Sequence, residues 1–261
     1  MRGKKIATIP VPEIRVPNYT AEHPDAEGNY YGLHTGTQGG CFDGTYFYQS
    51  FLKYCYNQNE VFASSFYVNN AKCIVRVVKY DVIADEVVRV SEEMDVLNHI
   101  NDITYHPGRG QLIACNSRGN KNTISFLNAD TLAYEGKQIL DYELYAISYH
   151  AYSDQYVLGI SGTYKVVITD NCFKEQSFFY INREHVANYT KQNICCDDNY
   201  IYCLFSGKKG VADYAIFVYD WEGQFVRSIK VDSEGEEPEN ASIYDGALYV
   251  CIGKKIQKIT L

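Results

Sequence analysis

Short runs in which apolar and polar residues alternate, separated by turn-forming residues, recur along the whole chain. Within residues 192–231 four such runs follow one another, at 192–196, 200–206, 215–220 and 225–231. Their β-branched and aromatic content, and turn signals such as Asp197-Asp-Asn199 and Trp221-Glu-Gly223, favour strands over helices. Because no window carries a sustained helical period, we expect little helix.

This four-strand unit recurs about five times, and each copy opens with a polar residue followed by a short apolar run. The copies open at residues 38, 101, 145, 192 and 240, and they align on Phe42, Tyr105, Tyr149, Cys196 and Tyr244. Successive alignment positions lie 63, 44, 47 and 48 residues apart, close to the roughly 40–50 residues of one four-stranded blade. The sequence therefore predicts an all-β fold, a five-bladed β-propeller that occupies residues 1–261 as one domain.

The last copy of the unit is one strand short. After the runs at 247–252 and 256–261 the chain ends with three strands made. The N-terminal segment Lys5-Ile-Ala-Thr-Ile-Pro10 has the pattern of a strand and can supply the fourth. We expect this N-terminal strand to pair into the C-terminal blade, which closes the ring and protects its sheet edges.

The order of strands within a blade predicts where function lies. Connections from strand 2 to strand 3, and from one blade to the next, share one face, which we call the top face. The long connections all fall there, at 16–36, 52–72, 117–121, 206–213 and 232–239. Long connections on a rigid scaffold commonly carry function, so we expect the binding surface at the top mouth of the central channel.

The starts of the innermost strands converge at this mouth. They present Gln38, Asn101, Tyr145, Gln192 and Asn240, which both donate and accept hydrogen bonds. The ring is bordered by His34, His99, Asp102, Glu143 and Glu239. Two interpretations stay open: the ring orients a polar ligand, or its amides satisfy backbone groups and channel water.

Other top-face connections add charge and aromatic residues. Arg118, Lys208 and Lys209 are candidates for contact with a carboxylate or phosphate, or are solvated loop charges. The segment 18–34 is either a lid or wall over the channel or a packed surface loop. The insertion 52–72, with Tyr54, Tyr56, Phe62, Phe66 and Tyr67, is either a ligand wall or an interface for a protein partner.

Composition excludes several function classes. With 261 residues and 46% hydrophobic content the chain can bury a substantial core, and its net charge of −8 argues against a broad nucleic-acid surface. No run approaches the ~18 apolar residues of a membrane span, and the N-terminus lacks a signal peptide, so we expect no membrane contact and a cytoplasmic protein. Nine cysteines without a Cys-x-x-Cys pair indicate reduced, buried thiols, and we assign no metal and no cofactor.

No catalytic motif is evident in the sequence. There is no Gly-x-Ser-x-Gly elbow and no phosphate-binding loop. His99 and Asp102 are a conceivable acid and base pair, but a spacing of three along a strand places them on opposite faces.

The first repeat resembles a known family. Thr37-Gln-Gly-Gly40, Phe42-Asp-Gly44 and Tyr46-Phe-Tyr48 resemble the opening signature of the glutamine cyclotransferases, the five-bladed glutaminyl cyclases of plants and bacteria. Asn101-Asp-Ile-Thr-Tyr105 is similar to the Asn-Glu-Leu-Glu-Tyr motif of that family. The resemblance implies that Gln38 holds an amide or ammonium substrate and that Asn101 and Asp102 line the same pocket. The chain lacks the tryptophans of that pocket, since its single Trp221 falls at an outer turn.

Three hypotheses of function follow. The first is a propeller that binds a small polar ligand, neutral or anionic, or a partner peptide at the top mouth without converting it. The second is an enzyme of glutaminyl-cyclase or glycan-cleaving type that uses the channel carboxylates Asp102, Glu143 or Glu239. The third is a structural interaction module that uses the insertion 52–72.

Overall fold

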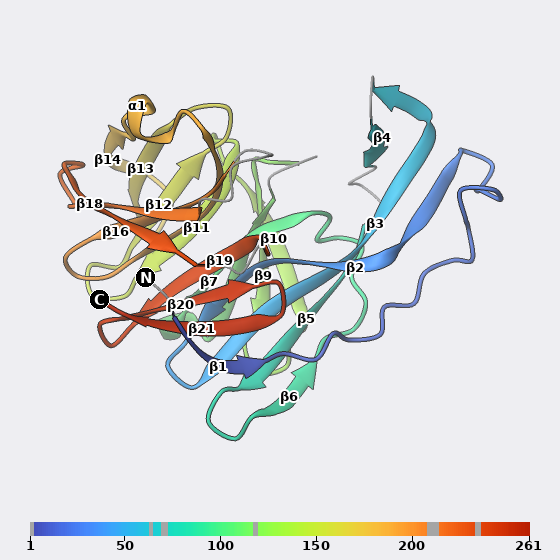
Figure 1. Ribbon diagram of the computed structural model, residues 1–261, viewed down its shortest axis with the longest axis horizontal. Helices are drawn as coiled ribbons and strands as arrows, with labels where there is room; N and C mark the ends of the chain where they lie inside the picture. The colour runs from blue at the N-terminus through green and yellow to red at the C-terminus, as the bar shows by residue number, and fades with distance from the viewer. Residues whose placement is uncertain (1–2, 63–64, 69–72, 117–119, 208–213, 233–235) are drawn as a thin grey trace.

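The strands form five antiparallel sheets that stand around a common axis, as Figure 1 shows for a computed structural model of the protein. The structure describes residues 3–62, 65–68, 73–116, 120–207, 214–232 and 236–261, with the side chains of 33, 34, 58–62 and 65–68 left aside. Each sheet carries four strands in one continuous path. The β-branched and aromatic runs of the sequence supply these strands.

The blades follow one another in chain order. Blade 1 comprises β2 (Asn29–Phe42), β3 (Tyr46–Phe62), β5 (Ile74–Asp81) and β6 (Glu86–Val90), with β4 (Ser65–Val68) paired to β3. Blade 2 comprises β7 (Ile100–His106), β8 (Gln111–Asn116), β9 (Thr123–Asn128) and β10 (Tyr134–Ile139). Blade 3 comprises β11 (Leu144–His150), β12 (Gln155–Ile160), β13 (Lys165–Asp170) and β14 (Glu175–Tyr180). Blade 4 comprises β15 (Tyr189–Cys196), β16 (Ile201–Gly207), β17 (Tyr214–Tyr219) and β18 (Phe225–Val231).

Blade 5 joins the two ends of the chain. It consists of β19 (Pro238–Tyr244), β20 (Ala247–Ile252), β21 (Lys255–Thr260) and β1 (Lys4–Thr8), with β1 antiparallel to β21. The backbone N–H of Ile9 extends this pairing by donating to the carbonyl of Lys254 at 2.9 Å, and the Ile9 side chain is fully buried. The predicted closure of the ring by the N-terminal strand is therefore confirmed.

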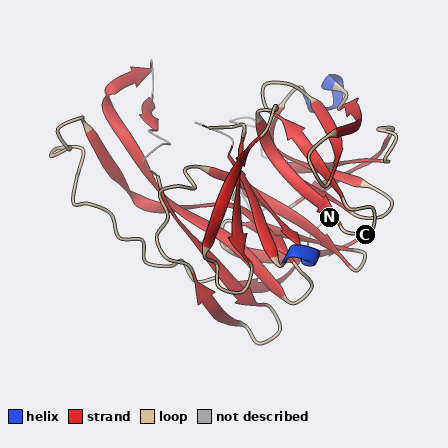
Figure 2. Ribbon diagram, turned by 180° about the vertical axis from the view of Figure 1, so that it is seen from behind, coloured by secondary structure: helices blue, strands red, loops and turns tan. Residues whose placement is uncertain are grey.

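The innermost strands close the ring. β2 contacts β7, β7 contacts β11, β11 contacts β15, β15 contacts β19, and β19 contacts β2. Within the described residues two short helices lie between strands, the 3-10 helix η2 (Pro107–Arg109) and α1 (Arg183–Val186), and Figure 2 shows them at opposite faces of the ring. The predicted five-bladed, all-β propeller is confirmed.

Five hydrophobic clusters fill the five seams between neighbouring blades. One cluster joins each pair of blades, from blades 1 and 2 around to blades 5 and 1. Because side chains alternate along a strand, each inner strand serves two clusters. Cys195 packs between blades 4 and 5, whereas its neighbour Cys196 packs between blades 3 and 4. Eight of the nine cysteines are buried, six of them in these clusters, and Cys172 is exposed.

Blade 1 differs from the sequence-based expectation. The segments 29–36 and 52–57, which the sequence analysis assigned to connections, are parts of β2 and β3 that pair with each other. β3 continues to residue 62, where it pairs with β4. Tyr30 on β2 stacks against Tyr56 on β3 with ring centroids 5.5 Å apart. Aromatic alternation on both segments therefore extends the hairpin, and Figure 1 shows it reaching past the other blades.

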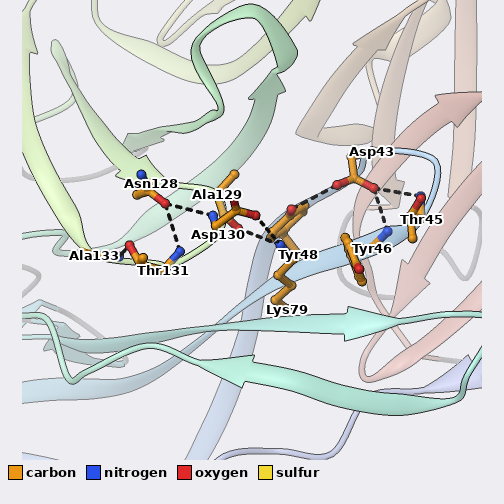
Figure 3. A network of polar contacts seen from close by, with 10 residues as sticks. All are labelled: Asp43, Thr45, Tyr46, Tyr48, Lys79, Asn128, Ala129, Asp130, Thr131 and Ala133. Carbon is orange, nitrogen blue, oxygen red and sulfur yellow. Dashed lines mark hydrogen bonds and ion pairs between the residues drawn. The ribbon is translucent and has the colours of Figure 1, made fainter.

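Polar contacts on the bottom face tie blade 1 to blade 2 (Figure 3). The buried Lys79 on β5 donates to the backbone carbonyl of Ala129 at 3.2 Å and to Asp130 Oδ1 at 3.0 Å. Its ammonium also lies 4.3 Å from the ring centre of Tyr46. Asp43 holds the adjacent turn by accepting hydrogen bonds from the backbone of Tyr46 and from the hydroxyl of Tyr48 (Figure 3).

Candidate functional site

Each innermost strand carries a β-bulge at the same level of the ring. The register against the second strand shifts between residues 37 and 40, 100 and 102, 144 and 146, 191 and 193, and 238 and 240. A bulge leaves a residue unpaired and re-aims its side chain. The bulges therefore place one set of five side chains at the top of the channel, namely Gln38, Asn101, Tyr145, Gln192 and Glu239.

These five residues line one pocket of about 530 Å³ at the top mouth. The remaining lining residues come from the long blade 1 hairpin, from the start of blade 2 and from the top of blades 4 and 5, namely Tyr54, Tyr56, His99, Thr190, Lys191 and Glu237. This volume lies in the range of small-molecule sites. The pocket is therefore a candidate ligand site assembled from every blade.

Neighbouring residues fix the orientation of Gln38. With the Gln38 Oε1 atom as acceptor, His99 Nε2 is the donor across 3.1 Å. Gln38 Nε2 donates to the hydroxyl of Tyr54 at 3.3 Å and to Glu239 Oε2 at 3.4 Å. Both hydrogens of this amide are thus engaged within the protein.

The side-chain N–H groups of the other two amides, Asn101 and Gln192, also donate to protein atoms. Asn101 Nδ2 donates to the backbone carbonyls of Tyr145, at 2.6 Å, and Gln192, at 2.8 Å. Gln192 Nε2 donates to Ser206 Oγ at 2.8 Å and to Glu237 Oε1 at 2.6 Å. An amide has two N–H groups, so what Asn101 and Gln192 have left for a ligand is their side-chain oxygen.

Charged groups in the pocket have displaced pKa values. Burial, with a further contribution from the Glu237 carboxylate, raises the pKa of Glu239 to about 8. Burial, with a further contribution from the Lys121 ammonium, lowers the pKa of Lys191 to about 8. Lys191 donates to the backbone carbonyls of Ile160 and Thr163, and its ammonium lies 4.5 Å from the ring centre of Tyr145. The lysine is therefore also engaged within the protein.

Tyr145 contributes differently from the other bulge residues. Its side chain is only 4% exposed and belongs to the cluster between blades 3 and 4. A Cβ at Gly159 would lie 2.6 Å from this ring, so the glycine makes the room that the tyrosine needs. Tyr145 therefore forms a wall beneath Lys191, while its hydroxyl is buried.

Directly below the bulges, a polar network spans the channel. Asp102 is fully buried and accepts hydrogen bonds from the backbone N–H groups of Ile103 at 2.8 Å, Ile147 at 3.0 Å and Ile194 at 3.4 Å, and from the carboxamide of Asn193. Burial raises the pKa of Asp102, and these four donors oppose the rise.

The same network reaches the two remaining blades. Asn193 Oδ1 accepts from the backbone N–H of Ala241 at 3.0 Å, on blade 5. Asn240 Nδ2 donates to the carbonyl of Gln38 at 3.2 Å and to Gln49 Oε1 at 2.9 Å, both on blade 1. Asp102, Asn193 and Asn240 therefore link all five blades and form the floor beneath the pocket.

The structure separates the sequence-predicted site residues into four groups. Those that line the pocket are Gln38, His99, Asn101, Tyr145, Gln192 and Glu239. Asp102 and Asn240 lie in the floor network, with both side chains fully buried. Arg118, Lys208, Lys209 and the side chain of His34 fall outside the described residues. Glu143 lies apart from the pocket, in a 3.7 Å ion pair with Lys121.

A one-residue difference explains why Asn240 lies in the floor. The sequence alignment matched Tyr244 to Cys196, but the strand registers make Ile243 the equivalent of Cys196, because Ile243 pairs with Leu248 as Cys196 pairs with Ile201. Glu239 is consequently the blade 5 counterpart of Gln192. Tyr244 is aromatic like Tyr105 and Tyr149, and this likeness shifted the alignment by one residue.

Sequence reasoning missed Lys191, Glu237 and Thr190 as lining residues. Lys191 lies one residue before the bulge residue Gln192, and Glu237 lies two residues before the bulge residue Glu239. A sequence alignment that places the bulges correctly would therefore have identified both as lining residues. Among the described residues, no group of three or more His, Cys, Asp or Glu is arranged to hold a metal ion. No helix among them is long and apolar enough to cross a membrane.

Comparison with known proteins bears on the fold. No family model and no curated protein matches this sequence. The structure is similar to that of glutaminyl cyclase from Myxococcus xanthus, with a TM-score of 0.55 and 10% identity, over 88% of this chain and 94% of that one. This similarity shows a shared propeller fold.

Two other solved structures match less well. Hydrazine synthase from Kuenenia stuttgartiensis has a TM-score of 0.44 and 11% identity over 82% of this chain, which spans 55% of that protein's chain. The WD40 domain of Neurospora crassa Pan2 has a TM-score of 0.43 and 7% identity, over 89% of this chain and 76% of that one.

Proposed function

We propose that the protein binds a small polar ligand in the top-mouth pocket, and that this ligand carries an amine or amide N–H group. The observation that carries the proposal is the state of the amides, since Gln38, Asn101 and Gln192 give their N–H groups to the protein. The pocket therefore offers amide and carboxylate oxygens, which are hydrogen-bond acceptors. A ligand that presents donors complements it.

Charge and aromatic content favour an ammonium group. Glu237 and Glu239 lie on one side of the pocket, and Tyr54 and Tyr56 form another wall. Tyrosine faces and the Glu237 carboxylate attract an ammonium ion, and a bound ammonium ion stabilises the ionised form of Glu239, which is protonated at neutral pH in the empty pocket. A free amino acid amide or the amino terminus of a partner peptide has this chemistry. The described lining favours such a cation over the anionic ligand that the sequence suggested.

Calorimetric titration at pH 7 tests the proposal with a matched pair of probes, cationic L-glutaminamide and anionic N-acetyl-L-glutamate. We expect the cation to bind, with affinity reduced at least about tenfold in Glu239→Gln and Gln192→Ala. Gln138→Ala, on the exposed outer strand β10, is the control. Binding of the anion alone, or wild-type affinity in both pocket variants, would show that the proposal is wrong.

One observation favours a second candidate, an enzyme in which Glu239 transfers protons. A carboxyl whose pKa is about 8 is protonated at neutral pH and can act as a general acid. The resemblance of Thr37-Gln-Gly-Gly40 to the glutamine cyclotransferase signature points the same way. Mass analysis of glutaminyl peptides after long incubation separates the two candidates. Loss of ammonia that depends on Glu239 supports the enzyme, and recovery of unchanged peptide supports a binding protein.

A further inference from the structure

A second polar cluster lies on the bottom face, between blades 3 and 4, at the opposite end of the channel from the mouth pocket. His150 ends β11, Ser153 lies in the turn to β12, and Asp198 lies in the turn from β15 to β16. His150 Nδ1 is 2.6 Å from Ser153 Oγ, and His150 Nε2 is 2.9 Å from Asp198 Oδ1. A hydroxyl, an imidazole and a carboxylate are thus joined in series.

The carboxylate decides which imidazole nitrogen carries the proton. An ionised Asp198 only accepts hydrogen bonds, so Nε2 is the donor to it. In the neutral ring Nδ1 then keeps its lone pair and faces the hydroxyl of Ser153. This is the arrangement in which an oriented base activates a serine nucleophile. His150 is 7% exposed and Ser153 is exposed, so the base is sheltered while the hydroxyl is accessible.

A pocket of about 320 Å³ adjoins this cluster. Its walls include Trp221, whose ring centroid is 4.8 Å from that of His150, and Ile168. The indole is held by its Nε1–H, which donates to the backbone carbonyl of Asp197 at 3.1 Å. Gln155 and Ser177 also line the pocket and bring N–H and O–H donors to it. An acyl group or aromatic alcohol therefore finds both an apolar surface and hydrogen-bond donors in the pocket that adjoins the serine.

We propose that Ser153 is a nucleophile that accepts the acyl group of small carboxylic esters, with His150 as its general base. Ser153 Oγ bonds to the carbonyl carbon as its proton moves to His150 Nδ1. The bond to the alcohol oxygen then breaks, and the imidazolium returns the proton to the departing alcohol. Water next attacks the acyl-serine and gives its proton to Nδ1. The ester bond to Oγ breaks, the proton returns to Oγ, and a carboxylic acid leaves.

The test is covalent labelling of the full-length protein with a serine-selective fluorophosphonate, together with hydrolysis of p-nitrophenyl acetate. All proteins carry Cys172→Ala, because this exposed thiol also reacts with activated esters. We expect one label per chain, located in the peptide that contains Ser153, and no label in Ser153→Ala. In His150→Ala we expect labelling to slow at least about tenfold and to recover with added imidazole.

Matched variants distinguish chemistry from structure. Ser161→Ala, in the turn after β12 on the same blade, should label at the wild-type rate. Asp198→Asn should slow labelling, and Asp198→Glu should restore it at unchanged melting temperature, because Asp198 acts by positioning His150. Labelling at another residue, absence of any label, or equal ester hydrolysis by Ser153→Ala would overturn the proposal. The mouth-pocket variants Glu239→Gln and Gln192→Ala test a different site, so their results affect neither the labelling of Ser153 nor the ester hydrolysis.

Discussion

The carboxamide of Asn193, on blade 4, donates a hydrogen bond to the carboxylate of Asp102, on blade 2, although these blades are not neighbours in the ring. The contact is possible because both residues follow a β-bulge at the same level of their strands. It holds the channel floor together directly beneath the side chains that line the mouth pocket. The site therefore depends on a buried polar network, and several consequences can be measured.

Replacing Asp102 should destabilise the fold strongly. Asp102→Ala leaves the buried N–H groups of Ile147 and Ile194 without an acceptor, and each unsatisfied buried group costs about 1–3 kcal/mol. We expect the free energy of unfolding in urea to fall by at least about 3 kcal/mol. The exposed Asp141→Ala should change it by less than about 0.5 kcal/mol. Equal effects of the two substitutions would refute a structural role for the network.

Gly39 should not tolerate a side chain. A Cβ at this position would lie 2.4 Å from Cα of Asp102, a backbone atom that cannot move aside alone. We expect Gly39→Ala to lower the free energy of unfolding by about 1–3 kcal/mol, the usual cost of overpacking. Gly108→Ala is the control, because its nearest neighbour would be a side-chain atom of His106 at 3.3 Å. A Gly39→Ala protein as stable as the control would mean that the floor is looser than described.

Because the N-terminal strand completes blade 5, we expect replacement of Ile9 to destabilise the fold. Its side chain is fully buried beside the β1–β21 pair, whereas Val11, two residues later, is 44% exposed. Ile9→Ala should lower the free energy of unfolding by about 2–5 kcal/mol, and Val11→Ala should lower it little. Chemical denaturation of the two variants checks this directly. Similar midpoints for both would argue against the closure.

Glu239 should make stability fall as pH rises through neutrality. Its pKa is about 8 in the folded protein and near the ordinary 4.5 when unfolded, so the folded state binds the proton more tightly. The stability that the protonated Glu239 carboxyl contributes to the folded state is therefore complete below pH 4.5, and it is lost as the pH rises to about 8. Between pH 6 and pH 9 we expect wild-type stability to drop by about 2 kcal/mol more than that of Glu239→Gln. Parallel pH profiles for the two proteins would contradict the assignment.

Lys191 should be unusually reactive at mild pH. Only a neutral amine is nucleophilic, and the pKa of Lys191 is lowered to about 8 by burial and by Lys121. In acetic anhydride labelling followed by peptide mass analysis, the rate at Lys191 should reach half its maximum near pH 8. Exposed lysine side chains in general reach this point near pH 10. Lys121→Gln should move the Lys191 midpoint upward, and a midpoint that does not move would exclude this charge as a cause.

The architecture could be predicted from the sequence because repetition and strand alternation are local patterns. The spacing of the five repeats from Phe42 to Tyr244, the strand pattern at Lys5 and the turns at Asp197 and Trp221 were enough to predict five blades and their closure. The exact register of the innermost strands could not be predicted, because a bulge is decided by contacts with neighbouring blades. Asn240 was therefore placed at the mouth, where Glu239 lies, and Asp102 was placed beside the pocket instead of beneath it.

The proximity of residues from different blades was equally hidden in the sequence. Gln192 contacts Glu237 only because blades 4 and 5 are adjacent, and His150 contacts Asp198 only because blades 3 and 4 are adjacent. The chain's single tryptophan appeared in the sequence as a turn residue. In the structure it forms the wall of a second pocket beside His150.

The central claim is that the five bulges gather side chains into one ligand site at the top mouth. Side-chain amide resonances of Gln38, Asn101 and Gln192, followed by nuclear magnetic resonance during titration with L-glutaminamide, test it most directly. We expect these three to shift together along one saturating binding curve, while the exposed amide of Gln138 stays unchanged. If the ligand saturates the protein and these three resonances do not move, the site lies elsewhere and the claim is wrong.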